Sequence, residues 1–395
     1  MNIIDGGITK VKGIKGQGVH AGFKKEKLDF TIIYSEKLCN AAGVFTKNKA
    51  AAAPVMVDRE FLSDGKAQAI VCNSGFANAC TGEEGIKDAL FTAEYTCTKL
   101  GIKKENCLVF STGIIGVPIP MDVMKSAIEK TVPMLESSPC ASENIATAIL
   151  TTDLVKKEVT IENDGYIISG ITKGSGMIHP NMATMLCFIF TDANVPSDIL
   201  KESLFSSVNK SFNRISVDGD TSTNDSLIIM ANGLSNINID SKEKIESFRK
   251  SLDHVCIELA KKIARDGEGA TKLIECECVG AKSQEDADIA SKSVISSSLV
   301  KSAIFGEDPN WGRIVAAVGY SGAEMELPKL DVWIGDLMIV KNGKAAGIPK
   351  SESRKVLQND FVKILINMNL GDYSSKAWGC DLSYDYVKIN AEYHT

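Results

Sequence analysis

The feature that most limits the fold of this chain is a series of short apolar runs close to glycine-containing turns. These runs have the length of buried strands and lie at residues 69–72, 107–110, 185–190 and 226–230. Glycine turns follow several of them, at residues 74–75, 112–113 and 232–233. Strands that end in such turns often present backbone amides to a site. The pattern therefore predicts a sheet with functional residues at its strand ends.

Two longer segments between these runs have the apolar spacing of amphipathic helices. The first, residues 84–100, is followed by Gly101, which is typical of a helix C-terminal cap. The second, residues 242–264, follows Asp240, and Asp240 with Glu243 predicts a capping box. Strands and helices in one chain indicate an α/β or α+β fold, and the sequence does not distinguish between these two classes.

The composition is that of an ordinary globular protein and argues against several kinds of partner. The 395 residues are 44% hydrophobic and carry a net charge of −6, so we expect no nucleic-acid binding. No apolar run is long enough to span a membrane, and the N-terminus lacks the pattern of a signal peptide. Eleven cysteines without a C-x-x-C pair indicate reduced thiols, and therefore a cytoplasmic protein.

Several fragments of cofactor and metal motifs are incomplete. Gly16 and Gly18 begin a glycine pattern that is one residue off the dinucleotide fingerprint. Residues 218–224 resemble the start of a calcium loop, but Thr223 and Ile229 stand where glycine and glutamate are needed. The four histidines are dispersed, without metal-binding or triad spacing. We therefore predict no metal and no cofactor, and a base other than histidine for any covalent chemistry.

The most unusual segment is residues 173–186, with the sequence KGSGMIHPNMATML. It has the pattern of a glycine-rich loop that enters an apolar strand at Thr184. If the Thr184 hydroxyl cut the bond after Ala183, the new α-amino group, with a pKa of about 8, would be a local base for that hydroxyl. An uncut loop-to-strand turn explains the same residues without chemistry, and the segment alone leaves both interpretations open.

This segment resembles the self-cleavage signature of the bifunctional ornithine acetyltransferase / glutamate N-acetyltransferase family of arginine biosynthesis. Other segments that resemble motifs of this family follow one another along the whole chain. They are residues 18–22 (GVHAG), 73–82 (NSGFANACTG), 111–116 (STGIIG), 151–153 (TTD), 218–225 (DGDTSTND), 265–272 (RDGEGATK), 308–313 (DPNWGR) and 390–395 (NAEYHT). Agreement at so many places, in order, identifies the chain as a member of the family.

The resemblance implies a self-cleaving fold with an N-terminal threonine nucleophile and β-sheets packed between helices, as in the ornithine acetyltransferases and aminopeptidases. Cleavage between Ala183 and Thr184 would leave an α chain of residues 1–183 and a β chain of residues 184–395. The resemblance further implies that two chains of each kind assemble into a heterotetramer.

The resemblance also implies the catalytic residues. Thr184 would be the acetylated nucleophile. The Thr112 hydroxyl and the Gly113 backbone N–H would bind the oxyanion of each tetrahedral intermediate. Glu268, between two glycines after a predicted helix, would either bind a substrate amino group or move a proton, and these two roles stay open.

Four residues are implied in substrate binding besides Thr184 and Glu268. Lys173 would pair with the substrate α-carboxylate, and the Thr151 hydroxyl would bind in the same region. Asn390 and Thr395 would contact the substrate side chain. Residues 386–391 alternate like a final strand, which would place Asn390 on the same face as Tyr386 and Lys388.

The implied reaction is a two-step transfer of acetyl from N2-acetyl-L-ornithine to Thr184 and then to L-glutamate. The resemblance allows acetyl-CoA as an additional acetyl donor, so that the enzyme is either monofunctional or bifunctional. The first alternative is a related self-cleaving aminopeptidase or amidohydrolase that transfers the acyl group to water. The second alternative is a non-enzymatic binding protein in which Thr184 is never freed.

Overall fold

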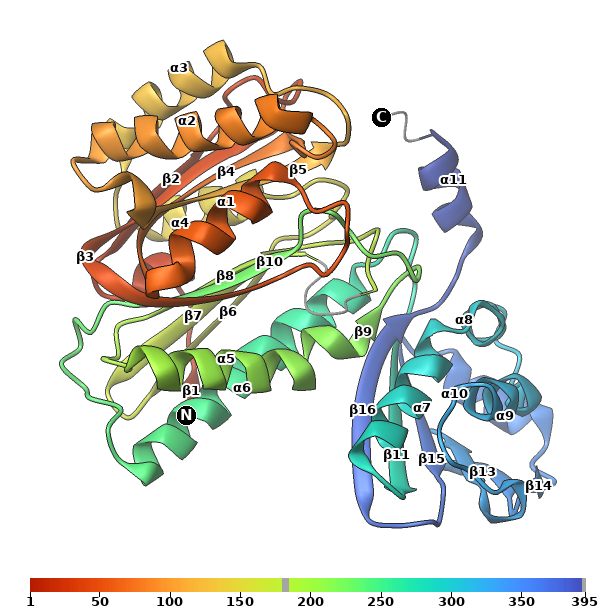
Figure 1. Cartoon of the computed structure of the whole chain (residues 1–395). Helices are drawn as coiled ribbons and strands as arrows, with labels where there is room; N and C mark the ends of the chain where they lie inside the picture. The colour runs from red at the N-terminus through yellow and green to blue at the C-terminus, as the bar shows by residue number, and fades with distance from the viewer. Residues whose placement is uncertain (180–184, 393–395) are drawn as a thin grey trace.

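The computed structural model describes residues 1–179 and 185–392, which form two sheets covered by helices (Figure 1). The larger sheet has nine strands within these ranges, in the order β1-β6-β7-β8-β10-β3-β4-β5, with β2 paired to β3. Their bounds are β1 Asn2–Ile3, β2 Ile14–Val19, β3 Phe30–Phe45, β4 Lys66–Phe76, β5 Cys107–Ile114, β6 Lys157–Asn163, β7 Tyr166–Lys173, β8 Leu186–Thr191 and β10 Ser226–Ala231. The four predicted strand positions are thereby confirmed.

The larger sheet lies between two layers of helices (Figure 1). The helices on one face are α1 (Ala53–Phe61), α2 (Gly82–Leu100), α3 (Met121–Thr131) and α4 (Pro139–Ala148); those on the other are α5 (Ser197–Lys210) and α6 (Lys242–Arg265). Side chains of β8 alternate between the two cores: Phe188 packs with the first layer, whereas Cys187 and Ile189 pack with the second. Both faces are buried, which explains why this strand is apolar throughout.

The smaller sheet lies in the C-terminal part and has its own hydrophobic core (Figure 1). In the described residues its seven strands are ordered β14-β13-β12-β15-β11-β16-β9. Their bounds are β9 Ile215–Ser216, β11 Leu273–Ala281, β12 Asp331–Ile334, β13 Leu337–Lys341, β14 Lys344–Ala345, β15 Phe361–Asn367 and β16 Tyr373–Cys380. The helices in this part are α7 Gln284–Ser296, α8 Ser298–Phe305, α9 Trp311–Gly319, α10 Lys350–Leu357 and α11 Tyr384–Glu392.

The two predicted amphipathic helices are confirmed as α2 and α6, but one predicted cap is wrong. Gly101 ends α2 with a left-handed conformation, φ 71°, as a glycine cap does. The N-cap of α6 is Ser241, whose hydroxyl accepts a hydrogen bond from the Lys244 N–H at 3.3 Å. Asp240 instead pairs with the Lys244 ammonium at 3.0 Å. The capping position is therefore shifted by one residue from the prediction, and the Asp240–Glu243 box does not form.

The predicted final strand is also wrong, because residues 386–391 lie within the helix α11. The Asn390 amide donates to the Tyr386 carbonyl oxygen at 3.0 Å, a contact across one helical turn. A segment this short satisfies both the strand and the helix pattern, so its periodicity does not decide between them. Asn390 is therefore presented by a helix rather than by a sheet.

The strand order bears on the predicted α and β chains. Strand β8, after the predicted cleavage point, lies between β7 and β10, and pairs antiparallel with β7. The division at residues 183 and 184 thus lies inside one sheet, so two separate pieces would stay joined by its hydrogen bonds.

None of the helices in the described ranges is both long and apolar enough to cross a membrane. All eleven cysteines are described and unpaired, as predicted.

Candidate active site

One cavity of about 340 Å³ brings together the predicted site residues that the structure describes. These six residues are Thr112, Gly113, Thr151, Lys173, Glu268 and Asn390. They come from distant parts of the sequence and from both sides of the predicted cleavage point. Ala183, Thr184 and Thr395 lie outside the described residues, although Met185 and Leu186 line the same cavity. The predicted set is thus gathered in space, while the chemical role of each member stays a prediction.

The predicted oxyanion donors lie at the end of β5, where this strand runs parallel to β4. Gly113 has φ 132° and lies opposite Gly75 in the register. A Cβ atom on Gly113 would overlap the carbonyl carbon of Gly75, so only glycine allows the two backbones to approach this closely. The Asn224 amide donates to the Ser111 and Ala77 carbonyl oxygens at 2.7 and 2.5 Å and so holds the turn against β10. The backbone that carries Thr112 and Gly113 is therefore closely constrained.

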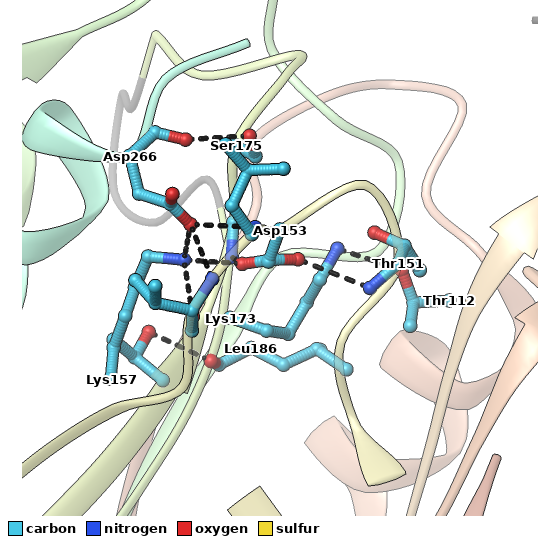
Figure 2. Close-up of polar contacts among 12 residues, drawn as sticks. Thr112, Thr151, Asp153, Lys157, Lys173, Ser175, Leu186 and Asp266 are labelled. Carbon is cyan, nitrogen blue, oxygen red and sulfur yellow. Dashed lines mark hydrogen bonds and ion pairs between the residues drawn. The ribbon is translucent and has the colours of Figure 1, made fainter. Parts of the chain in front are cut away.

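Lys173 is the last residue of β7 and pairs in register with Leu186, the first residue of β8. Its ammonium lies 3.4 Å from the Thr112 hydroxyl oxygen, to which it donates. A cation and a hydroxyl therefore lie side by side in the cavity (Figure 2). The arrangement suits a ligand that carries a carboxylate next to a polarisable carbonyl group.

A buried ion cluster lies beside Lys173 (Figure 2). The Lys157 ammonium contacts the carboxylates of Asp153 and Asp266 at 2.6 and 2.5 Å. The Lys157 side chain is fully buried, as is that of Asp153, and Asp266 is nearly so. Two acids around one buried cation leave one negative charge, which Lys173 is placed to balance.

The ion cluster fixes the segments that carry the site residues (Figure 2). Asp153 accepts hydrogen bonds from the Thr151 N–H at 3.1 Å and from the Gly174 N–H at 2.6 Å. The Asp266 carbonyl oxygen accepts from the Ser175 hydroxyl at 2.7 Å. Ser175 in turn accepts, through its own carbonyl oxygen, from the N–H of Glu268 at 3.0 Å. The predicted binding residues Thr151, Lys173 and Glu268 are thereby positioned by one connected network.

The charges in and around the cavity shift two pKa values. Burial by itself would raise the pKa of Asp153, but the charges of Lys173 and Lys157, together with the hydrogen bonds, lower it to about 2. Burial lowers the pKa of Lys24 to about 8, and the charge of Lys173 acts in the same direction. Lys24 donates to the Leu150 carbonyl oxygen at 2.5 Å, next to the segment that holds Thr151. Asp153 is therefore ionised at neutral pH and stabilises the ammonium groups around it.

Glu268 lies three residues after the end of α6 and lines the same cavity as Lys173. Its carboxylate accepts a hydrogen bond from the Asn390 amide at 2.9 Å, so α11 contacts the cavity through this pair. The carboxylate also packs against Gly176, where any Cβ atom would overlap it. The glycine at position 176 therefore makes room for a carboxylate within the loop that leads to Thr184.

The sequence prediction did not assign a role to Asp153, Lys157, Asp266 or Asp225. Asp153, Asp225 and Asp266 belong to the TTD, DGDTSTND and RDGEG motifs, so their position in a motif was a signal for them. Lys157 follows another lysine and has no such signal. Asp225 also lines the cavity and is only 2% exposed. Burial of these four charges depends on contacts between distant segments, which local sequence patterns do not report.

A cavity that combines a cation, carboxylates and a closely packed threonine–glycine turn has the groups that acyl transfer requires. The chain belongs to the ArgJ family, whose model matches residues 15–395. The predicted family is thereby confirmed, and with it an enzyme of arginine biosynthesis.

Proteins that are similar to this chain include one relative and two solved structures. An "arginine biosynthesis bifunctional protein ArgJ" from Caldanaerobacter subterraneus subsp. tengcongensis is 48% identical, with both chains covered completely. A crystal structure of the protein of that name from Bacillus halodurans is 47% identical; it covers 52% of this chain and 98% of its own, with a TM-score of 0.51. An ornithine acetyltransferase from Mycobacterium tuberculosis, complexed with ornithine, is 35% identical over 46% of this chain and 99% of its own, with a TM-score of 0.45.

Proposed function

We propose that the protein transfers the acetyl group of N2-acetyl-L-ornithine to L-glutamate through an acetyl-Thr184 intermediate, which yields L-ornithine and N-acetyl-L-glutamate. The observation that carries this proposal is the single cavity that joins all six described site residues. Both amino-acid substrates carry an α-carboxylate, so one cation can serve each half-reaction in turn. Membership of the ArgJ family supports the same reaction.

The first step of the proposed mechanism is self-cleavage between Ala183 and Thr184. The Thr184 hydroxyl attacks the preceding carbonyl, and hydrolysis of the resulting ester frees the α-amino group that later acts as its base. Support comes from the Bacillus halodurans structure, because the solved chain is almost fully covered by about half of this one. A polypeptide of that length is what a cut before Thr184 would leave.

In the second step, the Thr184 oxygen attacks the acetyl carbonyl of N-acetylornithine. Thr112 and Gly113, held rigidly at the end of β5, stabilise the oxyanion that forms. Lys173 binds the substrate α-carboxylate, with the Thr151 segment beside it. Ornithine then leaves, glutamate enters, and the same donors stabilise the second tetrahedral intermediate.

The part of the cavity lined by Glu268 and Asn390 recognises the rest of the substrate. Glu268 and Asn390 form one hydrogen-bonded pair there, and we propose that they contact the substrate amino group and side chain together with Thr395. Glu268 either binds this amino group only or also moves a proton. The pH dependence of acetyl transfer distinguishes these two roles. A carboxylate paired with an amide suits the recognition of a substrate ammonium group.

The wider assignments are part of the same proposal. No cofactor takes part, and acetyl-CoA serves as an additional acetyl donor in a bifunctional enzyme. The two pieces stay joined through the sheet and assemble as a heterotetramer of two α and two β chains. The unpaired thiols support a location in the cytoplasm.

Intact mass spectrometry with and without N-acetylornithine tests cleavage and acetylation together. We expect two pieces, residues 1–183 and 184–395, and one added acetyl group on the second piece when the donor is present. A single chain of 395 residues with full activity would overturn the mechanism. The aminopeptidase or amidohydrolase alternative predicts that the acetyl-enzyme passes its acetyl group to water rather than to glutamate, which the same sample reveals when glutamate is added.

A further inference from the structure

Asp225 is a buried carboxyl group in the cavity that the mechanism above does not use. It lies just before β10, and its side chain is 2% exposed. In the described structure, its Oδ2 atom is buried and has no hydrogen-bond partner. Buried polar atoms are rarely left without a partner, because this costs about 1–3 kcal/mol. An unpartnered oxygen that borders a ligand cavity therefore indicates a donor group that arrives with the reaction.

The strand register places Asp225 next to the start of β8. Strands β8 and β10 are parallel, with Ser226 opposite Leu186, and the Ser226 N–H donates to the Met185 carbonyl oxygen at 2.8 Å. Asp225 itself accepts through its carbonyl oxygen from the Thr46 N–H at 2.9 Å. Its backbone is thus fixed at the level of Met185, the residue that follows the nucleophile in the sequence.

The groups around Asp225 leave it without a cation of its own. Two residues lie beside Asp225 in the neighbouring chain segments: Thr46, which follows β3, and Met185, which precedes β8. Neither side chain ionises. The charged side chains that line the cavity with it are Lys173 and Glu268. Burial raises the pKa of Asp225 well above its usual range, while contacts with Ser222 and the charge of Lys173 act in the opposite direction. A carboxyl group in this setting is suited to gaining and losing a proton.

We propose that the Asp225 carboxyl group binds a primary amino group in this cavity and exchanges a proton with it during acetyl transfer. This inference rests on the proposed function. Two groups could be this primary amine: the amino group of the substrate and the α-amino group freed at residue 184.

The proton balance of the step is closed. The Thr184 oxygen loses its proton as it bonds to the acetyl carbon, and the departing nitrogen gains a proton as its bond to that carbon breaks. Asp225 donates the proton that the nitrogen gains and takes up the proton that the oxygen loses, directly or through the freed α-amino group. No other reactant is consumed, and glutamate reverses the sequence in the second half-reaction.

The test compares two acetyl donors on the matured enzyme. N-acetylornithine releases an amine, whereas p-nitrophenyl acetate releases none. We expect Asp225→Asn to slow acetylation by N-acetylornithine by about 10²- to 10⁴-fold. If p-nitrophenyl acetate reacts normally, the partner of Asp225 is the substrate amine; if it is slowed equally, the partner is the freed α-amino group. Normal rates with both donors would overturn the proposal.

Asp58 provides a matched control. It is also buried, its Oδ2 atom also lacks a partner in the described structure, and burial also raises its pKa. Its carboxylate accepts from the Val109 N–H at 2.8 Å and does not line the cavity. Asp58→Asn is therefore expected to acetylate at the wild-type rate with both donors.

Two further measurements keep the outcomes separate. If Asp225→Asn is not recovered in two pieces, Asp225→Glu is tested in its place. This variant keeps the carboxyl group and moves it by one methylene. A displaced pH profile of acetylation in that variant supports the proposal, and an unchanged profile contradicts it. Failure of the wild-type enzyme to become acetylated at all would instead contradict the proposed function, whatever the variants show.

Discussion

The two sheet regions of the molecule bury lysines in different surroundings. In the larger region, the Lys157 ammonium lies between the carboxylates of Asp153, 4 positions before it, and Asp266, 109 positions after it. In the smaller region, the Lys301 ammonium donates to the Cys380 carbonyl oxygen at 2.6 Å, and its side chain is almost equally buried. The first lysine thus holds charged partners, whereas the second mainly satisfies a backbone group.

This difference shows where the molecule uses buried charge. An ion cluster costs desolvation energy and demands a fixed geometry of all its members. In the larger region that geometry is shared with the Thr151 segment, Lys173 and the residues before Glu268. In the smaller region, none of the predicted site residues that the structure describes is hydrogen-bonded to Lys301. We therefore expect the chemistry to reside in the larger sheet and its border, with the smaller sheet as support.

The strongest test of this division is Thr184→Ala. Without the hydroxyl group, neither the attack on the Ala183 carbonyl nor acetyl transfer can begin. We expect an uncut chain with no detectable transfer activity, as shown by gel electrophoresis and an assay of ornithine release. A cleaved or active Thr184→Ala protein would exclude Thr184 as the nucleophile.

The second test sets Lys157→Met against Lys301→Met. Removal of Lys157 leaves two buried carboxylates without their cation, which costs roughly 3–5 kcal/mol of unfolding free energy. Removal of Lys301 leaves a carbonyl oxygen unsatisfied, at a cost of about 1–3 kcal/mol. Urea unfolding measures both values. At temperatures where both variants are folded, only Lys157→Met is expected to lower kcat/KM. Equal activity losses would show that the ion cluster does not position the site.

Thr112→Val sharpens the assignment of the oxyanion site. The substitution preserves the shape of the side chain and removes one donor, so kcat should fall about 10²- to 10³-fold, or roughly 3–4 kcal/mol. Steady-state kinetics with N-acetylornithine and glutamate measure the change. Since the backbone of Gly113 is held by Gly75, the remaining donor should stay in place. Wild-type turnover in Thr112→Val would exclude its hydroxyl group from the reaction.

Lys173→Met separates binding from chemistry. A hydrogen bond to a charged group contributes about 1.5–3 kcal/mol, so KM should rise roughly 10- to 100-fold for both amino acids while kcat changes little. Lys363→Met, which removes a lysine paired with Glu277 in the smaller sheet, is the control and should leave KM unchanged. Cleavage is confirmed before the kinetics are measured. An unchanged KM with a collapsed kcat would make Lys173 a catalytic group instead.

The smallest expected effect is the acid sensitivity of the ion cluster. The pKa of Asp153 falls from 3.8 to about 2 on folding. A lowered pKa stabilises the folded state above the unfolded value, and this stabilisation, roughly 2 kcal/mol, is lost as the pH falls from about 4 towards 2. Unfolding free energies measured across this range should show a steeper decline in the wild type than in Asp153→Asn. Parallel curves would indicate that Asp153 is not the responsible group.

Local patterns predicted much of the fold. The helices α2 and α6 were recognised because each buries one face, and their apolar residues recur with the helical period. Four strands were recognised because they are buried on both sides and are therefore apolar throughout. The C-terminal helix α11 was predicted as a strand, because it buries none of its residues and so carries no clear periodic signal.

The candidate site was predicted in part. The motifs around Thr112, Lys173 and Glu268 were recognisable because the backbone there needs glycine beside a polar group, a requirement that appears as a local sequence pattern. Lys157 was not recognisable, since a lysine between two acids looks like any surface lysine until the chain is folded. Asp225 is the last residue of the DGDTSTND motif, but its burial is visible only when β10 lies beside β8.

The sequence by itself thus determined the family, the positions of four apolar strands and two amphipathic helices, and the residue types available for acetyl transfer. Only the tertiary structure decided which charges lose their contact with water and which partners replace it. Burial and pairing arise from segments far apart in the chain, such as Asp153 and Asp266 around Lys157. Because the energy of a charge depends on its surroundings rather than on its neighbours in the sequence, the geometry and protonation of this site belong to the folded molecule.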